Sequence, residues 1–498
     1  MKKVAAAIIA IFLLALTASA DNVTNVSGTL RVRQNSIVSE PVTATTEDIT
    51  LYVRTTGADT NDGLTVGTAL LTPQEAIGRL PKVINHYSLV DIGEGTFDGF
   101  DVADFDVNIQ NGLIVQGQLR NPTLTTGAVS GTSTGGSTSQ LIDAGQNWTA
   151  NELRGMFLLV EGEYRLIRNN DDTTINMASV FAATCSGKVY EIQEPSTVIN
   201  TESYFGKGRI SIRNIRTNLT AANPAFTSCW YLQNLRVEGG SFAAVLVESS
   251  SGGTLSRIQA IGPATMGILI ETCTGTAHFY ETYSTATTFG YYFGMSYGIG
   301  NLRAYAYDTV SDGFRSYNTA AFENINATAE SCGADGFDLY SSSFGVEIDW
   351  LRSIDNTLHG LKLASVAWTE LKNGLISGNG NNGIYIDERL SSHAYAGGTL
   401  TLVGANVIEN NTLSGIIAKN HSYITLGACT GTNAGAYGLE LQDGSKATIT
   451  SATAITGATG DATINGGTTD LTWATDFAAD GDMVINLDNA CRIERKDP

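Results

Sequence analysis

Apolar and polar residues alternate in a short segment that recurs between Phe242 and Gly467. Each copy opens with a small anchor residue, and the first and third residues after it are apolar while the second varies. The clearest copies open at Gly267, Gly290, Gly313, Gly336, Gly360, Gly383, Gly415 and Gly438. Neighbouring anchors are 23 or 24 residues apart, except for the 32-residue step from Gly383 to Gly415. Further copies fall 23 residues before and after this series, at Ala244 and Asp461. Period-2 alternation predicts a strand with one buried face, and a fixed repeat of this length predicts a solenoid.

The repeat contains no helix-length amphipathic run, which argues against helical and leucine-rich repeats. Parallel strands stacked at about 4.8 Å per coil would satisfy one another's backbone groups. A coil of about 23 residues accommodates three short strands and three turns. The anchor glycine suits a turn with positive φ or a close backbone approach. We therefore predict an all-β protein, a parallel β-helix.

The anchors and the Asn-rich segments 377–383 and 409–415 resemble the right-handed parallel β-helix (pectate-lyase-like) superfamily. The resemblance covers about half of the chain and implies the fold. It implies no single function, because the superfamily includes lyases, hydrolases, epimerases, phage tailspikes and adhesins. The chain also departs from two enzyme families of the superfamily: neither the polygalacturonase set of motifs nor the Trp-Ile-Asp-His segment of pectate lyases is present.

Residues 1–20 have the pattern of a secretory signal peptide. Lys2 and Lys3 precede an apolar run over residues 4–16, and Ala18-Ser-Ala20 follows. This pattern predicts cleavage before Asp21 and a secreted or cell-surface protein. The run is shorter than the ~20 residues of a membrane span, and no other stretch predicts one.

The next segments predict an arm and a cap. Residues 21–49 are polar and without repeat, whereas residues 50–121 read as an N-terminal cap and the first coils. Within the cap, Thr72, Pro73 and Glu75 predict a short helix that begins with a capping box and ends at Pro81. A turn before it carries Asp59, Asn61 and Asp62, which are suited either to Ca²⁺ or to closing the turn with their side chains. The order of strand, turn, helix and strand resembles the N-terminal cap of many β-helix proteins.

Residues 122–196 break the repeat and predict an inserted small β module with hairpin turns at Glu161-Gly162 and residues 169–172. Its aromatic residues Trp148, Tyr164 and Tyr190 suit either a small core or stacking on sugar rings. The main parallel β-helix is expected over residues 197–467. Residues 468–498 are expected to form a C-terminal cap, because an open last coil invites edge-to-edge association. Either a monomer or a homotrimer is compatible with this organisation.

The composition excludes some partners. The formal charge of −20 and the pI near 4.6 argue against nucleic acid. Six cysteines form no C-x-x-C motif and read mostly as buried small hydrophobic residues. A disulfide between Cys185 and Cys229 is the alternative for an exported chain.

The side chains at the second and fourth positions after each anchor should point away from the core. In the middle coils these positions are rich in tyrosine and charged residues. The residues there are Tyr292, Arg315, Tyr317, Asp338, Tyr340, Lys362, Tyr385 and Asp387. Aromatic and charged side chains at ~4.8 Å spacing suit an extended polysaccharide. A ladder of salt bridges through Arg315, Asp338 and Lys362 is the alternative, with a purely structural role.

The longest step of the repeat adds a loop beside this strip. The loop starts at Asp387, ends near Gly398 and carries Glu388, Arg389, His393 and Tyr395. A lyase needs a base, a cation to neutralise the substrate carboxylate, and an acid for the leaving oxygen. Lys362, Tyr385, Arg389 and His393 are suitable types. A hydrolase pair of Asp338 and Asp387 would be about 12 Å apart, too far for the known geometries.

The sequence thus predicts an exported β-helix that binds polysaccharide along its strand face and cleaves it as a lyase. The alternative is a non-catalytic surface adhesin or a tailspike-like spike. Tyr292, Arg315, Tyr317, Asp338, Tyr340, Asp387, Glu388 and Tyr395 are the expected substrate-binding residues. Ca²⁺ is the one cofactor that the sequence suggests.

Overall fold

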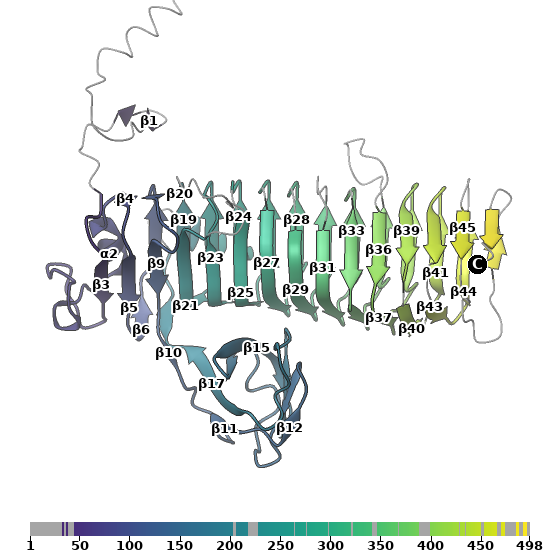
Figure 1. The fold of residues 1–498 in the computed structure, drawn as a ribbon, viewed down its shortest axis with the longest axis horizontal. Coiled ribbons are helices and arrows are strands. Elements are labelled where there is room, and N and C mark those ends of the chain that lie inside the picture. The colour runs from purple at the N-terminus through teal and green to yellow at the C-terminus, as the bar shows by residue number, and fades with distance from the viewer. Residues whose placement is uncertain are drawn as a thin grey trace, which may run out of the picture. The chain divides into compact units, whose positions relative to one another are not determined.

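The computed structural model describes residues 32–33, 36–37, 44–202, 206–217, 228–262, 264–274, 276–296, 298–319, 322–340, 346–366, 368–387, 399–427, 429–433, 435–449, 453–465, 470–473, 485–487 and 492–495. The chain divides into two units, residues 1–44 and 45–498. In the first unit, β1 (Val32–Arg33) pairs antiparallel with β2 (Ser36–Ile37). The second unit contains the solenoid, the inserted module and both described helices (Figure 1).

One face of the solenoid is a parallel sheet of 13 strands. Each strand pairs with the equivalent strand of the next coil, so the stacking predicted from the repeat is confirmed. In spatial order the strands are β7 (Phe100–Ala103), β19 (Gly208–Arg213), β22 (Ala243–Glu248), β24 (Met266–Glu271), β26 (Phe289–Gly294), β28 (Phe314–Tyr317), β30 (Phe337–Tyr340), β32 (Leu361–Ala364), β35 (Ile384–Asp387), β38 (Ile416–Lys419), β41 (Tyr437–Gln442), β44 (Gly460–Asn465) and β46 (Ile485–Leu487). We call this the first sheet.

A second parallel sheet of 21 strands completes the coils. Its strands are β3 (Ile49–Val53), β5 (Ser88–Ile92), β6 (Gly95–Phe97), β9 (Leu113–Gln116), β18 (Thr197–Ile199), β21 (Trp230–Glu238), β23 (Thr254–Ile261), β25 (Thr276–Thr285), β27 (Gly298–Tyr307), β29 (Phe322–Glu330), β31 (Val346–Ile354), β33 (Thr369–Lys372), β34 (Leu375–Ser377), β36 (Thr399–Val403), β37 (Asn406–Glu409), β39 (Tyr423–Leu426), β40 (Cys429–Asn433), β42 (Lys446–Ile449), β43 (Thr453–Gly457), β45 (Asp470–Trp473) and β47 (Arg492–Arg495). A three-stranded sheet of β4 (Val83–Ile84), β8 (Asp106–Val107) and β20 (Arg216–Thr217) lies in the first coils.

The expected three strands per coil occur as one strand of the first sheet and two segments of the second. In β21, β23 and β25 the two segments are continuous and bend at a residue with positive φ: Asn234, Arg257 and Glu281, respectively. From β33 onward the bend separates two strands, and Asn373, with a φ of 52°, lies between β33 and β34. A left-handed residue turns the chain without lengthening the coil, which keeps the period constant.

The anchor glycines are required for a close approach, and the alternative explanation, a positive φ, is wrong for them. None of the anchors from Gly267 to Gly415 has a positive φ. A Cβ atom on each would lie 2.5–2.8 Å from the carbonyl oxygen of the next anchor glycine. Real Cβ atoms do not approach an oxygen so closely, so the stacking itself selects glycine.

The core runs through the solenoid and contains two internal ladders. The rings of Tyr291, Phe314 and Phe337 are stacked face to face, with 4.6 Å between neighbouring centroids. At a corner, the side-chain amides of Asn356, Asn379, Asn411 and Asn433 form a buried chain of hydrogen bonds of 2.9–3.0 Å. The aromatic ladder fills the interior with stacked rings at the coil spacing. The asparagine ladder satisfies its own buried polar groups from one coil to the next.

The N-terminal cap contains η1 (Val66–Thr68) and the predicted helix, α2 (Pro73–Arg79). The hydroxyl of Thr72 accepts a hydrogen bond from the amide of Glu75, as expected. The capping box is incomplete, because the Glu75 carboxylate pairs with Arg79 and the amide of Thr72 donates instead to Asp59. The i,i+4 ion pair thus takes the group that would have closed the box.

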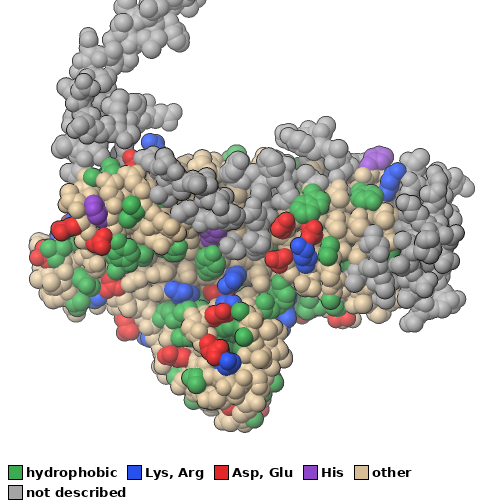
Figure 2. Space-filling view, viewed as in Figure 1, with side chains coloured by type: hydrophobic (Ala, Val, Ile, Leu, Met, Phe, Trp, Pro, Cys, Tyr) green, Lys and Arg blue, Asp and Glu red, His purple; other side chains and the backbone are tan. Residues whose placement is uncertain are grey.

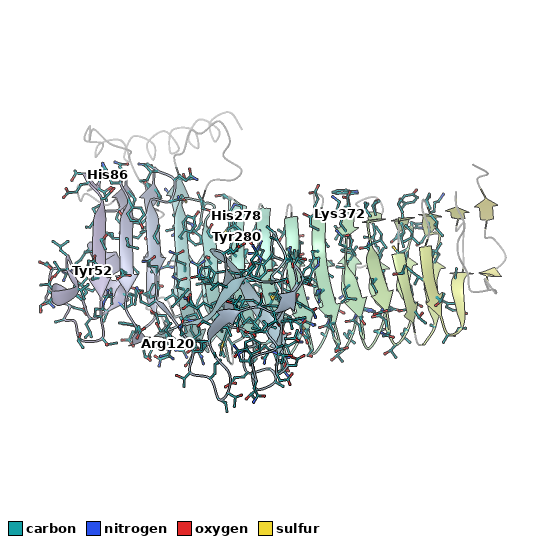
Figure 3. The ribbon with its side chains drawn as sticks, turned by 60° about the horizontal axis from the view of Figure 1, so that its bottom comes forward. Tyr52, His86, Arg120, His278, Tyr280 and Lys372 are labelled. Atoms are coloured by element: carbon teal, nitrogen blue, oxygen red, sulfur yellow. The ribbon has the colours of Figure 1, made fainter. Side chains whose placement is uncertain are left out.

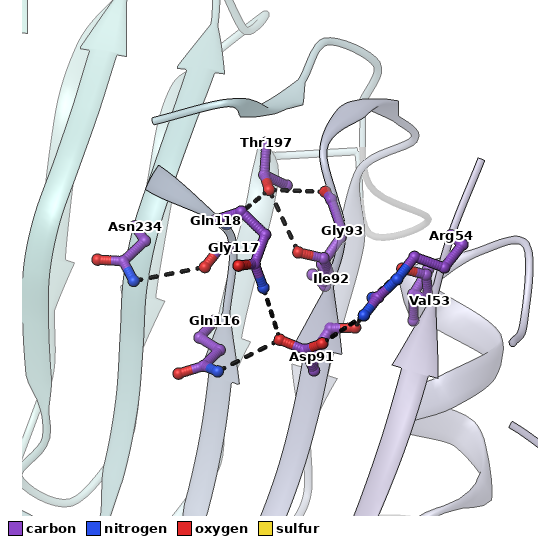
Figure 4. A network of polar contacts seen from close by, with 10 residues as sticks. All are labelled: Val53, Arg54, Asp91, Ile92, Gly93, Gln116, Gly117, Gln118, Thr197 and Asn234. Carbon is purple, nitrogen blue, oxygen red and sulfur yellow. Dashed lines mark hydrogen bonds and ion pairs between the residues drawn. The ribbon is translucent and has the colours of Figure 1, made fainter. Parts of the chain in front are cut away.

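A polar network joins the first coils at the point where the chain leaves for the module and returns (Figure 4). The Asp91 carboxylate accepts from Arg54 at 2.7 Å and from the side chains of Gln116 and Gln118. The hydroxyl of Thr197 donates to the carbonyl of Gly93 and accepts from the amide of Gln118. The segment that leads into the module and the segment that leads out of it are therefore both hydrogen-bonded to the first coils.

The module is antiparallel and spans residues 119–195, compared with the 122–196 expected. Its strands are β10 (Leu119–Arg120), β11 (Ser130–Thr132), β12 (Gly135–Gly136), β13 (Gln140–Ile142), β14 (Phe157–Val160), β15 (Glu163–Asn170), β16 (Thr174–Met177) and β17 (Val189–Pro195). Glu161 and Gly162 both have positive φ in the β14–β15 turn, as a two-residue hairpin requires. Trp148 and Tyr190 are buried in a separate small core, whereas Tyr164 packs against the solenoid side.

The module is fixed to the second sheet by buried contacts. The Glu281 carboxylate, on β25, accepts from the amide of Leu166 at 2.7 Å and from the hydroxyl of Ser179. Phe157 and Leu166 pack against Tyr283 and Tyr305 of the solenoid. A buried, fully bonded carboxylate inside an apolar contact indicates a specific orientation of the module.

The described cysteines are unpaired and buried, so the suggested disulfide between Cys185 and Cys229 does not form. The two residues belong to different cores, that of the module and that of the solenoid. At the C-terminal end, β45, β46 and β47 continue both parallel sheets beyond the boundary at residue 467 that the sequence suggested. In the described part of the chain, no helix is long and apolar enough to cross a membrane.

Candidate functional site

The strip predicted from the sequence lies on the outer face of the first sheet. The strand register places Tyr292, Arg315, Asp338, Lys362 and Tyr385 in one column. Two residues further along each strand, Tyr317 is opposite Tyr340 and Ala364 is opposite Asp387. Period-2 alternation therefore orients these side chains as expected, and the in-register pairing puts neighbours one coil apart.

Two tyrosines form a flat pair on this face. The rings of Tyr317 and Tyr340 are 5.4 Å apart between centroids and only 6° from parallel. Tyr317 is 40% exposed, while Tyr340 is half-buried. Stacked rings on a rigid sheet present their outer edges and faces without a large entropic cost on binding.

The charged residues of the column form an alternating network. Lys362 Nζ lies 3.2 Å from a carboxylate oxygen of Asp338 and 3.2 Å from one of Asp335. Arg315 lies 3.8 Å from the other oxygen of Asp338 and 3.5 Å from Asp312. The three carboxylates are buried, whereas the two cations are partly exposed above them. The salt-bridge ladder considered from the sequence is thus present, with Asp312 and Asp335 added to it.

Asp312 and Asp335 belong to a second column that the strand pattern did not reveal, formed by the residues that precede the anchor glycines from Gly313 to Gly415. Its members are Asp312, Asp335, His359, Asn382 and Ser414. In each of the first four, a side-chain atom accepts a hydrogen bond from the backbone amide of the next member, at 3.0–3.3 Å. The signal in the sequence is a run of polar residues at one register position. It lies outside the strand alternation, which begins only after the anchor.

The environment changes the protonation of these groups. Burial, with Asp338 and Asp335 nearby, raises the pKa of Asp312 to about 6. Burial also raises the pKa of Asp338, although Lys362 opposes the shift. For Lys362 burial acts against the charge, but Asp338 and Asp335 outweigh it and raise the pKa. Lys362 is therefore a firmly charged ammonium group rather than a base.

Asp312 makes the stability depend on pH in a testable way. A carboxyl group with a folded pKa near 6 stabilises the fold while it is protonated, and this contribution is lost as the pH rises through about 6. Asp312→Asn keeps the oxygen that accepts from the amide of Asp335. We expect the free energy of unfolding of this variant, minus that of wild type, to increase by about 2 kcal/mol from about pH 4 to about pH 8. Urea unfolding of both proteins at the two pH values measures this difference. A pH-independent difference would contradict the assignment.

Tyr385 and His359 form the far end of the strip. Their rings are stacked at 4.5 Å between centroids. The Tyr385 hydroxyl donates to Asp387 at 2.8 Å, and Asp387 also accepts from Asn420. Burial and this bond raise the pKa of Tyr385, and burial lowers the pKa of His359 to about 4. At neutral pH, Tyr385 is therefore a phenol and His359 a neutral imidazole. Nδ1 of His359 accepts from the backbone and side-chain amides of Asn382.

The structure brings most of the predicted strip together, but two of its residues are less exposed than the sequence pattern predicted. Asp338 and Asp387 are only 5% and 7% exposed, so they support their neighbours from below rather than facing solvent. Asp387 is two coils from Asp338 and two residues further along the strand, as the sequence indicated. The four loop residues Glu388, Arg389, His393 and Tyr395 lie outside the described residues.

The side chains considered for Ca²⁺ have protein partners. Asp59 accepts from the amides of Leu71 and Thr72, and Asp62 accepts from the amide of Leu64. The Asn61 amide donates to the carbonyl of Ala69. These bonds close the turn in the way that the alternative interpretation predicts. Within the described ranges, no group of three His, Cys, Asp or Glu side chains is placed to hold a metal ion.

No protein-family model and no characterised protein sequence matches the chain. Several solved structures are similar in fold. The tailspike protein gp49 of Pseudomonas phage LKA1 is 12% identical with a TM-score of 0.26, over 83% of this chain and 72% of that one. The A-module of a mannuronan C-5 epimerase from Azotobacter vinelandii is 12% identical with a TM-score of 0.26, over 82% and 91%.

The catalytic domain of a GH87 alpha-1,3-glucanase is 10% identical with a TM-score of 0.28, over 77% of this chain and 97% of that one. These similarities are distant and carry no argument about function. The strand pairing described above, and not any one similarity, establishes the fold: the chain is a parallel β-helix protein of the kind that its repeat predicts.

Proposed function

We propose that the protein binds an extended polysaccharide along the outer face of the first sheet, between β26 and β35. The observation that carries the proposal is the flat Tyr317–Tyr340 pair beside two cations on one rigid face. Tyrosine faces accept the apolar side of a sugar ring, and Lys362 and Arg315 present N–H donors to hydroxyl or carboxylate oxygens. The one-coil spacing repeats these groups along a line, as an extended chain requires.

Binding receives more support than cleavage by a lyase. A lyase needs a deprotonated base beside the sugar carboxylate. Lys362 is held as an ammonium between two carboxylates, and the Tyr385 hydroxyl donates to Asp387. These two residues therefore suit recognition and positioning. A lyase would take its base from elsewhere, with Arg389 and His393 of the 388–398 loop as the sequence-based candidates.

A second candidate function is glycoside hydrolysis, which the buried carboxylates favour. Asp335 and Asp338 each place an oxygen 3.2 Å from Lys362 Nζ, so these oxygens are at most twice that distance, 6.4 Å, apart. This range includes the separation of about 5–5.5 Å found in retaining glycosidases. Asp312, with its pKa near 6, holds a proton in mildly acidic solution as a general acid must.

We also propose that the protein is exported, on the pattern of residues 1–20. An exported chain reaches polysaccharides of a cell surface or of the surroundings, which is where the proposed ligand would be found. Antibody detection of the chain in the culture medium or at the cell surface, compared with a version that begins at Asp21, tests this step. Retention of both versions inside the cell would contradict it.

Removal of the tyrosine pair tests binding. We expect Tyr317→Ala and Tyr340→Ala each to weaken retention on a polysaccharide gel about tenfold, because each loses one stacking surface of roughly 1 kcal/mol or more. Affinity electrophoresis with a panel of acidic and neutral polysaccharides measures this. Tyr423→Ala is the matched control, since Tyr423 is similarly exposed at 38% but lies on β39 of the second sheet.

The same incubations distinguish the chemistries. New reducing ends together with ultraviolet absorbance of an unsaturated sugar acid would establish a lyase. Reducing ends without that absorbance would establish a hydrolase, and Asp338→Asn would then remove the activity. Retention without products would establish a binding protein of the adhesin or spike type. Retention that the tyrosine variants leave unchanged would contradict the proposed face.

A further inference from the structure

A cleft of about 560 Å³ lies between the module and the second sheet, on a different sheet from the strip. The module contributes β15 and residues 180–182, and the solenoid contributes β23, β25, β27 and β29. Figure 3 shows Tyr280, one of the lining residues, on β25 beside the module. The volume suits a molecule of one or two sugar rings.

The cleft is locally positive in a chain of net charge −20. It contains three arginines and two carboxylates, and Arg165 is within 4 Å of both carboxylates, those of Glu163 and Glu281. No carboxylate of the described residues lies within ion-pair distance of Arg257 or Arg303. Figure 2 shows Lys and Arg side chains where the module meets the solenoid. Three guanidinium groups against two carboxylates leave a net positive charge in the cleft, which favours an anionic ligand.

The guanidinium groups of Arg257 and Arg303 both lie against aromatic rings. Arg257 lies 4.6 Å from the centre of the Tyr164 ring, and its Nε donates to Asn234 at 2.7 Å. Arg303 lies 5.7 Å from the centre of the Tyr280 ring and makes no hydrogen bond or ion pair with another described residue. The rings limit the freedom of the cations, while N–H donors of Arg303 remain available.

A buried acceptor completes the site. The side-chain oxygen of Asn326 is buried in the described structure with no hydrogen-bond donor, and Asn326 is directly opposite Arg303 in the β27–β29 register. An unsatisfied buried oxygen calls for a hydroxyl or N–H donor. The ligand should therefore carry an anionic group for the guanidinium groups and a hydroxyl donor for Asn326.

We propose that this cleft is a second binding site, for a sugar acid of one or two rings. The carboxylate pairs with Arg303, a ring hydroxyl donates to Asn326, and apolar ring edges contact the aromatic lining. A neutral sugar leaves the cations without a partner, and an inorganic anion without an O–H group, such as sulfate, leaves the Asn326 oxygen without a donor. This inference does not depend on polysaccharide binding at the strip, because the two sites share no residue.

The test is calorimetric titration of the full chain with D-glucuronate, with D-glucose and sulfate as comparison ligands. We expect glucuronate to bind with a dissociation constant of roughly a millimolar or below, and glucose and sulfate to bind more weakly. Arg303→Gln should weaken glucuronate binding about tenfold. Asn326→Asp, which changes little volume but adds a negative charge, should abolish it. Circular dichroism verifies that each variant is folded.

Two controls separate this site from others. Arg120→Gln removes an exposed arginine of the module that pairs with Glu194 outside the cleft, and should leave binding unchanged. Tyr317→Ala should also leave glucuronate binding unchanged, although it weakens polysaccharide retention. Equal binding of glucose, binding of sulfate alone, no binding of glucuronate, or unchanged binding in both cleft variants would each overturn the proposal.

Discussion

Gly336→Ala is expected to destabilise the protein by about 3 kcal/mol or more, although it adds a single methyl group. A Cβ atom at this position would lie 2.7 Å from the carbonyl oxygen of Gly360 in the next coil and would overlap the Ser353 hydroxyl. It would also approach the Asn356 amide, which belongs to the buried ladder. None of these groups can move without shifting a coil whose register is shared with its neighbours. Urea unfolding followed by circular dichroism measures the change.

Two glycine variants separate steric overlap from backbone strain. Gly78 lies in α2, and a methyl group there would meet no atom within 4 Å, so Gly78→Ala should be neutral or stabilise the protein by up to about 1 kcal/mol. Gly162 has equally open surroundings but a φ of +85°, so Gly162→Ala should cost only about 1–2 kcal/mol of backbone strain. If Gly336→Ala costs no more than Gly162→Ala, the close-approach explanation of the repeat fails.

Lys362→Met is expected to lower the free energy of unfolding by about 3 kcal/mol at about pH 8. The ammonium group lies 3.2 Å from both Asp335 and Asp338, whose carboxylates are buried, and its removal leaves two close negative charges. Lys362 lowers the pKa of Asp338, so without the lysine this carboxyl group takes up its proton at a higher pH in the folded state. The destabilisation is therefore present at about pH 8 and shrinks as the pH falls to about 4.

Lys372→Met is the matched control, since Lys372 pairs with Glu370 on an exposed surface, and no measurable change is expected. Lys362→Arg retains the positive charge and should recover most of the stability. Unfolding curves at the two pH values decide the matter. If Lys362→Met is as stable as wild type at both, the lysine is not the counter-ion of the acidic cluster. Its role would then have to be sought in direct contact with a ligand.

The fold was largely predictable because the solenoid repeats one local pattern. Alternating apolar residues at 23-residue steps specify the strand, its buried face and the register with its neighbours. The constant step length also predicted one outward column, and the strand pairing confirms it: Tyr292, Arg315, Asp338, Lys362 and Tyr385. The short helix at residues 73–79 was also predictable, because Thr72 and Pro73 are local signals of a helix start.

The site was less predictable, because its chemistry depends on contacts between coils. The pattern indicated that Asp338 and Asp387 face outward, but neighbouring side chains from adjacent coils leave them buried. The pKa of Asp312 follows from its burial beside Asp335 and Asp338, which a strand pattern does not describe. The polar column before the anchor glycines became apparent only when its side chains were seen to cap successive backbone amides.

The sequence by itself determined the period, the stacking and the face on which the charged and aromatic residues lie, since all three follow from local alternation. Only the tertiary structure decided that Lys362 is held as an ammonium group that suits binding, because its carboxylate partners Asp335 and Asp338 come from the neighbouring coil. It also decided where the module lies. The cleft with Arg257, Arg303 and Asn326 arises from contacts between the module and the solenoid, such as that of Leu166 with Glu281, 115 residues apart in the sequence, which no repeat encodes.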